Sequence, residues 1–157
     1  MSDSPRNACD MAAPAEPRIC SVARTLEVVG EKWALLAVRE VFLGNRRFDE
    51  MVRRTGAPRD TLTARLRTLV DAGILQRHRY SDHPQRFEYH LTAAGRDLYP
   101  VILTLLRWGD EHLAGREGPP LVLEHTCGHR LIPELTCQAC GEVVDPAETT
   151  RRSPTSS

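Results

Sequence analysis

Apolar residues recur every three or four positions through the middle of the chain, which is the spacing of one buried face of a helix. Glycine and proline separate the runs, and these residues favour helix ends and helix beginnings. The pattern predicts four successive helices: one from near Cys20 to Gly30, one at about 32–43, a short one beginning at Phe48, and one at about 58–72.

The third and fourth predicted helices are separated by a short turn at 55–58 that contains Gly56. Leu62, Leu66 and Leu69 share one face of the fourth helix, while its opposite face is polar and basic. A short helix, a tight turn with glycine and a second helix with a basic outer face together indicate a helix-turn-helix.

Two β segments are predicted next, at 74–80 and 86–91, joined by a turn-rich loop at 81–85. They form a hairpin, or wing. A long helix is then predicted from Thr92 to about His112, and it is apolar around much of its circumference. Such a helix must be buried on more than one side. Because a chain this small has one core, a second copy is the simplest cover, and a homodimer is expected.

The expected fold class is therefore mainly α: a winged helix-turn-helix with a β-hairpin wing, followed by a small C-terminal Cys/His hairpin. Four regions are predicted along the chain. They are a flexible N-terminal arm at 1–17, the winged helix-turn-helix domain with its dimerisation helices at 18–114, a zinc-ribbon-like segment at 121–144 and a disordered tail at 145–157.

Charge is uneven along the chain although the 21 basic and 21 acidic residues cancel. Between Arg46 and Arg86 there are ten arginines and five acids, which is the local basic excess typical of a DNA-binding surface. The alternative is an ordinary solvated surface of ion pairs.

The sequence has no apolar run of about 18 residues and no signal-peptide pattern, so no membrane association and a cytoplasmic location are expected. The odd number of cysteines, five, is consistent with a reducing compartment.

Five segments, taken in order, resemble the HxlR-type family of transcription regulators. They are CSVARTLEVVGEKW from Cys20, RRF from Arg46, TLTARLRTL from Thr61, AGIL from Ala72 and RFEYHLTAAG from Arg86. The resemblance covers about 18–112. It implies a winged helix-turn-helix, a homodimer built by the first and last helices, and binding to double-stranded operator DNA. It does not cover 121–144.

The candidate DNA-binding residues lie on the fourth helix and on the wing. An α-helix fits the major groove, where arginine reads guanine and short Thr or Ala side chains contact thymine methyl groups. Wing arginines reach phosphates or the minor groove. The candidates are Arg59, Thr61, Thr63, Ala64, Arg65 and Arg67 on the helix, and Arg77, Arg79 and Arg86 on the wing. The alternative is that some of them pair with Asp60, Asp71 or Asp82.

Cys20 is a redox-sensing candidate, because a helix N-terminus favours the thiolate form. In several HxlR-like regulators a cysteine near this place senses oxidants or electrophiles. An inert cysteine buried at the dimer interface is the interpretation we favour. Cys9, or Cys20 of a second chain, would be its resolving partner.

The C-terminal segment carries Cys127, Cys137 and Cys140, with His129 or His125 nearby. Four Cys and His ligands suit a tetrahedral, structural zinc ion, and His129 is the preferred fourth ligand. The alternatives are a metal-free hairpin or a redox-active Cys-x-x-Cys pair.

Two classes of function compete. One is a sequence-specific DNA-binding transcription regulator, a dimeric repressor or activator that responds to a small-molecule or redox signal from an unknown inducer. The other is a thiol or zinc enzyme, which the sequence does not favour, since it has no Ser-His-Asp arrangement, no phosphate-binding glycine loop and no paired carboxylates. A third possibility makes the Cys/His segment a protein-interaction module.

Overall fold

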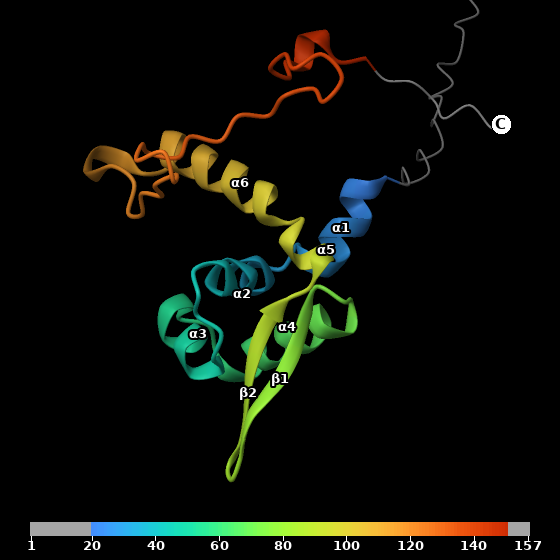
Figure 1. Ribbon diagram of the computed structural model, residues 1–157, viewed down its shortest axis with the longest axis vertical. Coiled ribbons are helices and arrows are strands. Elements are labelled where there is room, and N and C mark those ends of the chain that lie inside the picture. The colour runs from blue at the N-terminus through green and yellow to red at the C-terminus, as the bar shows by residue number, and fades with distance from the viewer. Residues whose placement is uncertain (1–19, 151–157) are drawn as a thin grey trace, which may run out of the picture.

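The computed structural model describes residues 20–150 and consists of helices around one β-hairpin (Figure 1). The predicted arm at 1–17, with Cys9, lies outside the described residues. In chain order the elements are α1 Ser21–Val29, α2 Lys32–Phe42, α3 Phe48–Thr55, α4 Arg59–Asp71, β1 Leu75–Asp82, β2 Gln85–Leu91, α5 Ala93–Arg96 and α6 Tyr99–His112. Two short 3-10 turns follow, at Gly115–Glu117 and Pro146–Glu148, the second within the part of the predicted tail that the structure describes.

The hydrophobic core lies where α2, α3 and α4 meet the base of the hairpin. Six large side chains there are fully buried: Val38, Met51, Leu62, Leu66, Leu69 and Leu75. Burial of each such side chain contributes about 1.5–3 kcal/mol relative to leaving it exposed. The three leucines of α4 lie on the face that the sequence pattern predicted to be apolar, so this prediction is confirmed.

Glu40 is the one buried charged residue in the described part of the chain, with 2% of its surface exposed. Its carboxylate accepts hydrogen bonds from Arg39 Nη2 at 2.6 Å and from Asn45 Nδ2 at 2.7 Å. A buried carboxylate needs such partners, because an unpaired one is costly. The Asn45 bond ties the end of α2 to the loop that carries Arg46 and Arg47.

The hairpin pairs β1 and β2 in antiparallel register, with Leu75 opposite Leu91 and Arg77 opposite Tyr89. The register shifts between Arg79 and Ser81. The loop before α3 extends this sheet, because Arg47 forms an isolated bridge with Glu88 on β2. The predicted hairpin is therefore confirmed, with longer strands than expected and a short third segment that the sequence pattern did not predict.

The predicted continuous helix from Thr92 to about His112 is wrong in one respect, since it is broken into α5 and α6 at 97–98. Pro100 supplies the physical reason, because it has no N–H to donate to the carbonyl of Arg96. None of the residues of α6, all of which the structure describes, is buried. Figure 1 shows α6 extending away from the helices of the core. No helix within residues 20–150 combines the length and apolar character needed to cross a membrane.

Candidate nucleic-acid interface

The two helices of the predicted helix-turn-helix, α3 and α4, are joined by a tight turn. Gly56 has φ of 71°, in the left-handed region that favours glycine. The Thr55 hydroxyl donates to the carbonyl of Met51 at 2.7 Å and accepts from the N–H of Ala57 at 3.1 Å. These bonds hold the turn, and the buried leucines of α4 direct its opposite face toward solvent.

The structure places four of the six predicted residues of α4 on its exposed surface: Arg59, Thr63, Ala64 and Arg67. Thr61 and Arg65 are half-buried. The Nε atom of Arg65 is buried and has no hydrogen-bond partner within residues 20–150. Arg67 has the most exposed side chain of the ion-paired arginines in this part of the chain, at 85%. Its Nε lies 3.8 Å from Asp71, so the two are only loosely paired.

Arg59, at the first turn of α4, is held more firmly. Its Nη1 lies 2.9 Å from Asp49 Oδ1, and its guanidinium lies 4.8 Å from the centre of the Phe48 ring. Both partners belong to the first turn of α3. The stack and the ion pair therefore orient the guanidinium before any ligand arrives, while 62% of the side chain remains exposed.

The three predicted wing arginines, Arg77, Arg79 and Arg86, are exposed. The guanidinium of Arg77 lies 4.1 Å from the centre of the Phe87 ring, and Arg79 Nε lies 3.0 Å from Asp82 Oδ1. Figure 1 shows the hairpin extending beyond the helices, with its tip at the far end of the molecule. The alternative that some of these arginines pair with Asp71 and Asp82 therefore holds for Arg67 and Arg79.

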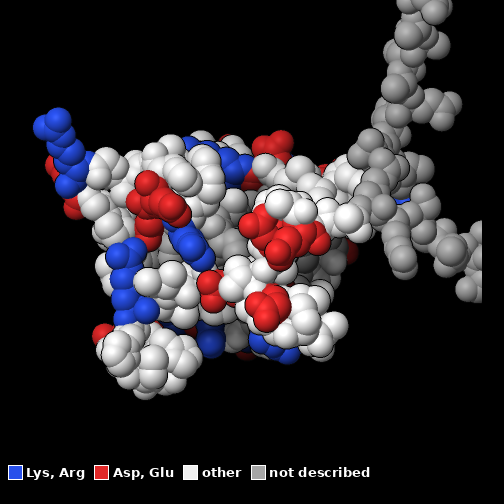
Figure 2. All heavy atoms as spheres, turned by 90° about the horizontal axis from the view of Figure 1, so that it is seen from above, with Lys and Arg blue, Asp and Glu red and all other residues white. Residues whose placement is uncertain are grey.

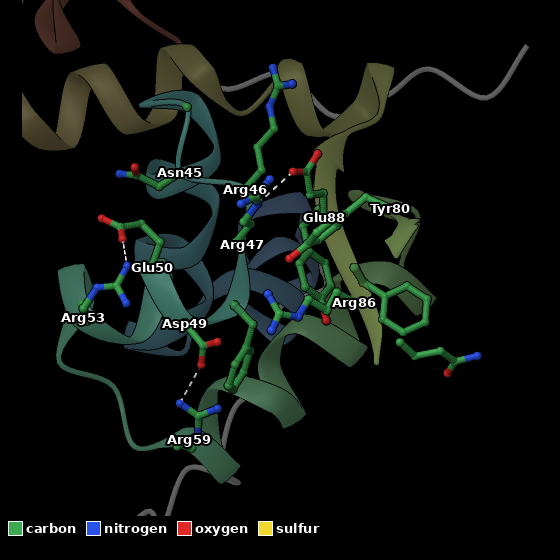
Figure 3. Close-up of a pocket in the computed structure, with 15 residues that line it drawn as sticks. Asn45, Arg46, Arg47, Asp49, Glu50, Arg53, Arg59, Tyr80, Arg86 and Glu88 are labelled. Atoms are coloured by element: carbon green, nitrogen blue, oxygen red, sulfur yellow. Dashed lines mark hydrogen bonds and ion pairs between the residues drawn. The ribbon is translucent and has the colours of Figure 1, made fainter. Parts of the chain in front are cut away.

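A cleft of about 940 Å³ separates the hairpin from α3 and the start of α4 (Figure 3). Five arginines line it: Arg46, Arg47, Arg53, Arg59 and Arg86. Three acids, Asp49, Glu50 and Glu88, line it as well. Arg46, Arg47 and Arg53 are not among the DNA-binding residues predicted from the sequence. The paired arginines at 46–47 were a visible signal, but only folding brings them beside the hairpin.

The acids of this cleft are already bound by arginines. Arg54 and Arg53 donate hydrogen bonds to Glu50 and lower the pKa of that carboxyl. Arg47 Nε donates to Glu88 Oε1 at 3.0 Å and lowers its pKa in the same way. Both carboxylates therefore stay ionised at lower pH than usual, and each is offset by at least one arginine.

The opposite end of the molecule has a different character. Figure 2 views the molecule from the end away from the hairpin tip, and acidic side chains gather there among uncharged ones. Basic side chains are visible on this face as well, most of them toward its edges. The arginine-rich cleft and the polar face of α4 thus distinguish the hairpin end of the molecule.

Cys20 is the N-cap of α1, and its Sγ accepts a hydrogen bond from the N–H of Ala23 at 3.3 Å. Its position at a helix start agrees with the sequence pattern. The side chain is half-buried, so it is neither fully enclosed nor fully exposed in a single chain.

The C-terminal segment contains two short turns. One is closed by the His125 N–H, which donates to the carbonyl of His129 at 2.9 Å, and the other by the Cys137 N–H, which donates to Glu142 at 2.8 Å. The N–H groups of Cys140 and Ala139 donate to Cys137 Sγ and lower the pKa of that thiol. Within residues 20–150, no three Cys, His, Asp or Glu side chains converge on a metal-binding geometry.

Comparison with known proteins identifies the family. Residues 28–117 match the family model described as HxlR-like helix-turn-helix. This chain belongs to the HxlR-like helix-turn-helix family. An uncharacterised HTH-type transcriptional regulator of Mycobacterium tuberculosis is 53% identical to it over 125 residues, which is 79% of each chain. The family is one of transcription regulators, as the resemblance implied.

Solved structures agree with this HxlR-like assignment. The structure of PA1607, a proposed transcription factor, has a TM-score of 0.76 and 29% identity, and the match covers 86% of this chain and 95% of that one. A match that long includes part of the C-terminal segment. The redox regulator HypR in its oxidised form has 35% identity and a TM-score of 0.52, over 59% of this chain and 97% of that one. The fold is the predicted winged helix-turn-helix.

Proposed function

We propose that this HxlR-like chain acts in the cytoplasm as a homodimer on double-stranded operator DNA. In this proposal α4 enters the major groove, and Arg59 and Arg67 reach base edges or phosphates. The cleft between α3 and the hairpin receives the sugar-phosphate backbone. The observation that carries the proposal is that the exposed face of α4, the arginines of the cleft and the wing arginines all belong to the hairpin end of the molecule.

A salt series on a selected duplex tests DNA binding. A 30-base-pair site is selected with the full-length protein from a random library, and its affinity is compared with that of a scrambled duplex. We expect the selected site to bind roughly 10³-fold more tightly, with log affinity falling linearly against log salt. The selected sites should be pseudo-palindromic, with half-sites roughly one helical turn apart. Equal affinity for both duplexes at every salt concentration would contradict the proposal.

The homodimer is supported by apolar side chains that a single chain leaves in water. On α6, Leu105 is 52% and Trp108 55% exposed, and on α1, Leu26 is 54% exposed. Val101 lies on the same stripe of α6 as Leu105 and Trp108. An apolar stripe of this kind marks a protein interface, and two-fold pairing would bury it against a second copy.

Signal response is proposed to involve Cys20, which is the alternative to the inert, buried cysteine that the sequence favoured. Its place as an N-cap and its partial burial support a thiol that an oxidant or electrophile could reach. The likeness to HypR, a redox regulator, supports it as well. We expect hydrogen peroxide to change operator affinity in the wild type but not in Cys20→Ser. The same response in Cys20→Ser would exclude this cysteine as the sensor.

Zinc binding remains a proposal for the C-terminal segment, through Cys127, Cys137, Cys140 and one of His129 or His125. The support is the donor set of three cysteines and a histidine, together with two N–H groups that donate to Cys137 Sγ and favour its thiolate. The two turns would have to approach each other on binding, so metal binding and folding of this segment would be coupled.

Elemental analysis of protein purified without added metal tests this proposal. We expect about one zinc per chain in the wild type and in the control Cys20→Ser, and loss of zinc in Cys137→Ser/Cys140→Ser. Well below half an equivalent in the wild type, or full zinc in the double variant, would remove the hypothesis.

A further inference from the structure

An apolar cavity of about 260 Å³ lies between α2, α6 and the start of the C-terminal segment, and it shares no lining residue with the arginine-rich cleft. It lies between the helix that supports the helix-turn-helix and the helix proposed for dimerisation. Its walls include Leu36, Phe42, Ile102, Leu106, Leu121 and Leu123. The last two residues belong to the C-terminal segment, which therefore covers the cavity from one side.

The residues that line the cavity are apolar except for Tyr99, which bears a hydroxyl, and Arg39. The rings of Phe42 and Tyr99 lie with their centres 4.7 Å apart and form an aromatic part of the wall. Arg39 is the one charged side chain among the described residues that line the cavity. Two of its nitrogens, Nε and Nη2, hold Glu40 Oε1 at 3.0 and 2.6 Å. Because a guanidinium has five N–H donors, others remain for an anion.

A small ligand fits this cavity better than a side chain of a second copy. On α6, the exposed Val101 and Trp108 lie outside the cavity, whereas Tyr99 and Leu105 line it. The flank that bears the cavity is instead covered by Leu121 and Leu123 of the same chain. Ligand pockets are typically apolar with a few placed polar groups, as this one is.

The volume indicates the size of the ligand. A dry apolar cavity of about 150 Å³ holds benzene, so one of about 260 Å³ admits two fused rings. We propose that this cavity binds a planar aromatic acid of about two rings. The rings lie between α2 and α6, and the acid group meets the guanidinium of Arg39.

Such a ligand would contact both α2, which packs on α4, and α6. It would therefore bias operator affinity if the two states of the dimer differ in the spacing of these helices. This regulatory role rests on the proposed function. Binding itself does not, so it is measured without DNA.

Isothermal titration of the full-length protein with 2-naphthoate tests the proposal. We expect one saturable site per chain and weaker binding of 2-naphthamide, which has the same rings but no negative charge. Leu123→Trp should weaken 2-naphthoate binding at least tenfold by filling the cavity. Val122→Trp is the matched control, because Val122 is exposed, is its chain neighbour and does not line the cavity, and it should bind within twofold of wild type.

A second variant, Ile102→Trp, fills the cavity from the opposite wall and should weaken binding as Leu123→Trp does. No saturable binding by the folded wild type at millimolar 2-naphthoate would overturn the inference. So would binding that neither tryptophan variant weakens, since the probe would then occupy another site. If operator binding persists in either case, only the ligand proposal fails and the proposed DNA-binding function is unaffected.

Discussion

Arginine side chains at the hairpin end differ in how firmly they are held. Arg47 pairs with Glu88 and lies 4.5 Å from the centre of the Tyr80 ring, while Arg59 pairs with Asp49 and stacks on Phe48. Arg67 has only a long contact with Asp71. Exposed ion pairs contribute little to stability, so a phosphate or base can replace the exposed Asp49 and Asp71.

Arg67→Ala should therefore weaken operator binding without unfolding the protein. If Arg67 contacts a base, the loss is about 1–3 kcal/mol of binding free energy, and Arg59→Ala/Arg67→Ala should lose more. Fluorescence anisotropy with the selected duplex measures the affinity, and thermal unfolding checks the fold. Arg116→Ala, on an exposed turn beyond α6, is the control and should bind normally. A folded double variant with wild-type affinity would show that this face of α4 does not contact the DNA.

One contact between elements leaves no space for a larger side chain. At the start of α5, a Cβ on Gly95 would lie 2.2 Å from the carbonyl oxygen of Ile74, which already accepts from Thr92. This glycine lets the chain leave the hairpin and pass directly over the backbone of Ile74, between α4 and β1. Gly109, within α6, has no atom within 4 Å of such a Cβ among the described residues.

These two glycines should respond oppositely to the same substitution. Gly95→Ala should lower the free energy of unfolding by about 1–3 kcal/mol, because the backbone must shift to accept the methyl group. Gly109→Ala should raise it by up to about 1 kcal/mol, since alanine favours the helix. Urea denaturation at one protein concentration measures both. Equal effects of the two changes would mean that the backbone near Ile74 can move aside for the added methyl group at little cost in free energy.

At the scale of the whole molecule, polarity is divided between two ends. Arginines cluster near the hairpin, while α1 and α6 leave apolar side chains exposed. The C-terminal segment does not cover the stripe on α6, although Arg107 donates to the carbonyl of Pro133 at 2.6 Å and attaches this segment to another side of the helix. A second copy remains the proposed cover.

Trp108→Glu should therefore convert the proposed dimer into monomers, because pairing would bury a charge on the two-fold interface. Sedimentation equilibrium at micromolar concentration measures the mass. Leu135→Glu is the control, since it places the same charge on an exposed apolar residue of the C-terminal segment. A wild type that sediments as a monomer would contradict the proposed homodimer. Dissociation of both variants would mean that the interface is not confined to α6.

The sequence by itself determined the local elements and the face of each that is buried. Leu62, Leu66 and Leu69 identified the inner face of α4, and therefore its outer face, because helical spacing alone sets which side chains share a side. Alternation and turn residues likewise located the hairpin. The basic stretch and the order of the family-like segments then sufficed to predict a winged helix-turn-helix regulator.

Only the tertiary structure decided which distant residues meet. Arg47 and Glu88 are 41 positions apart, and no local spacing indicates that they pair across the cleft. The same holds for Leu121 and Leu123, which close a cavity against α2. The physical reason is that periodicity reports the environment of one element, whereas contacts between elements depend on how the core packs and where the chain turns back. Pro100 illustrates both points. The proline is visible in the sequence, but the apolar pattern continues across it, so the pattern alone did not predict that the helix ends there.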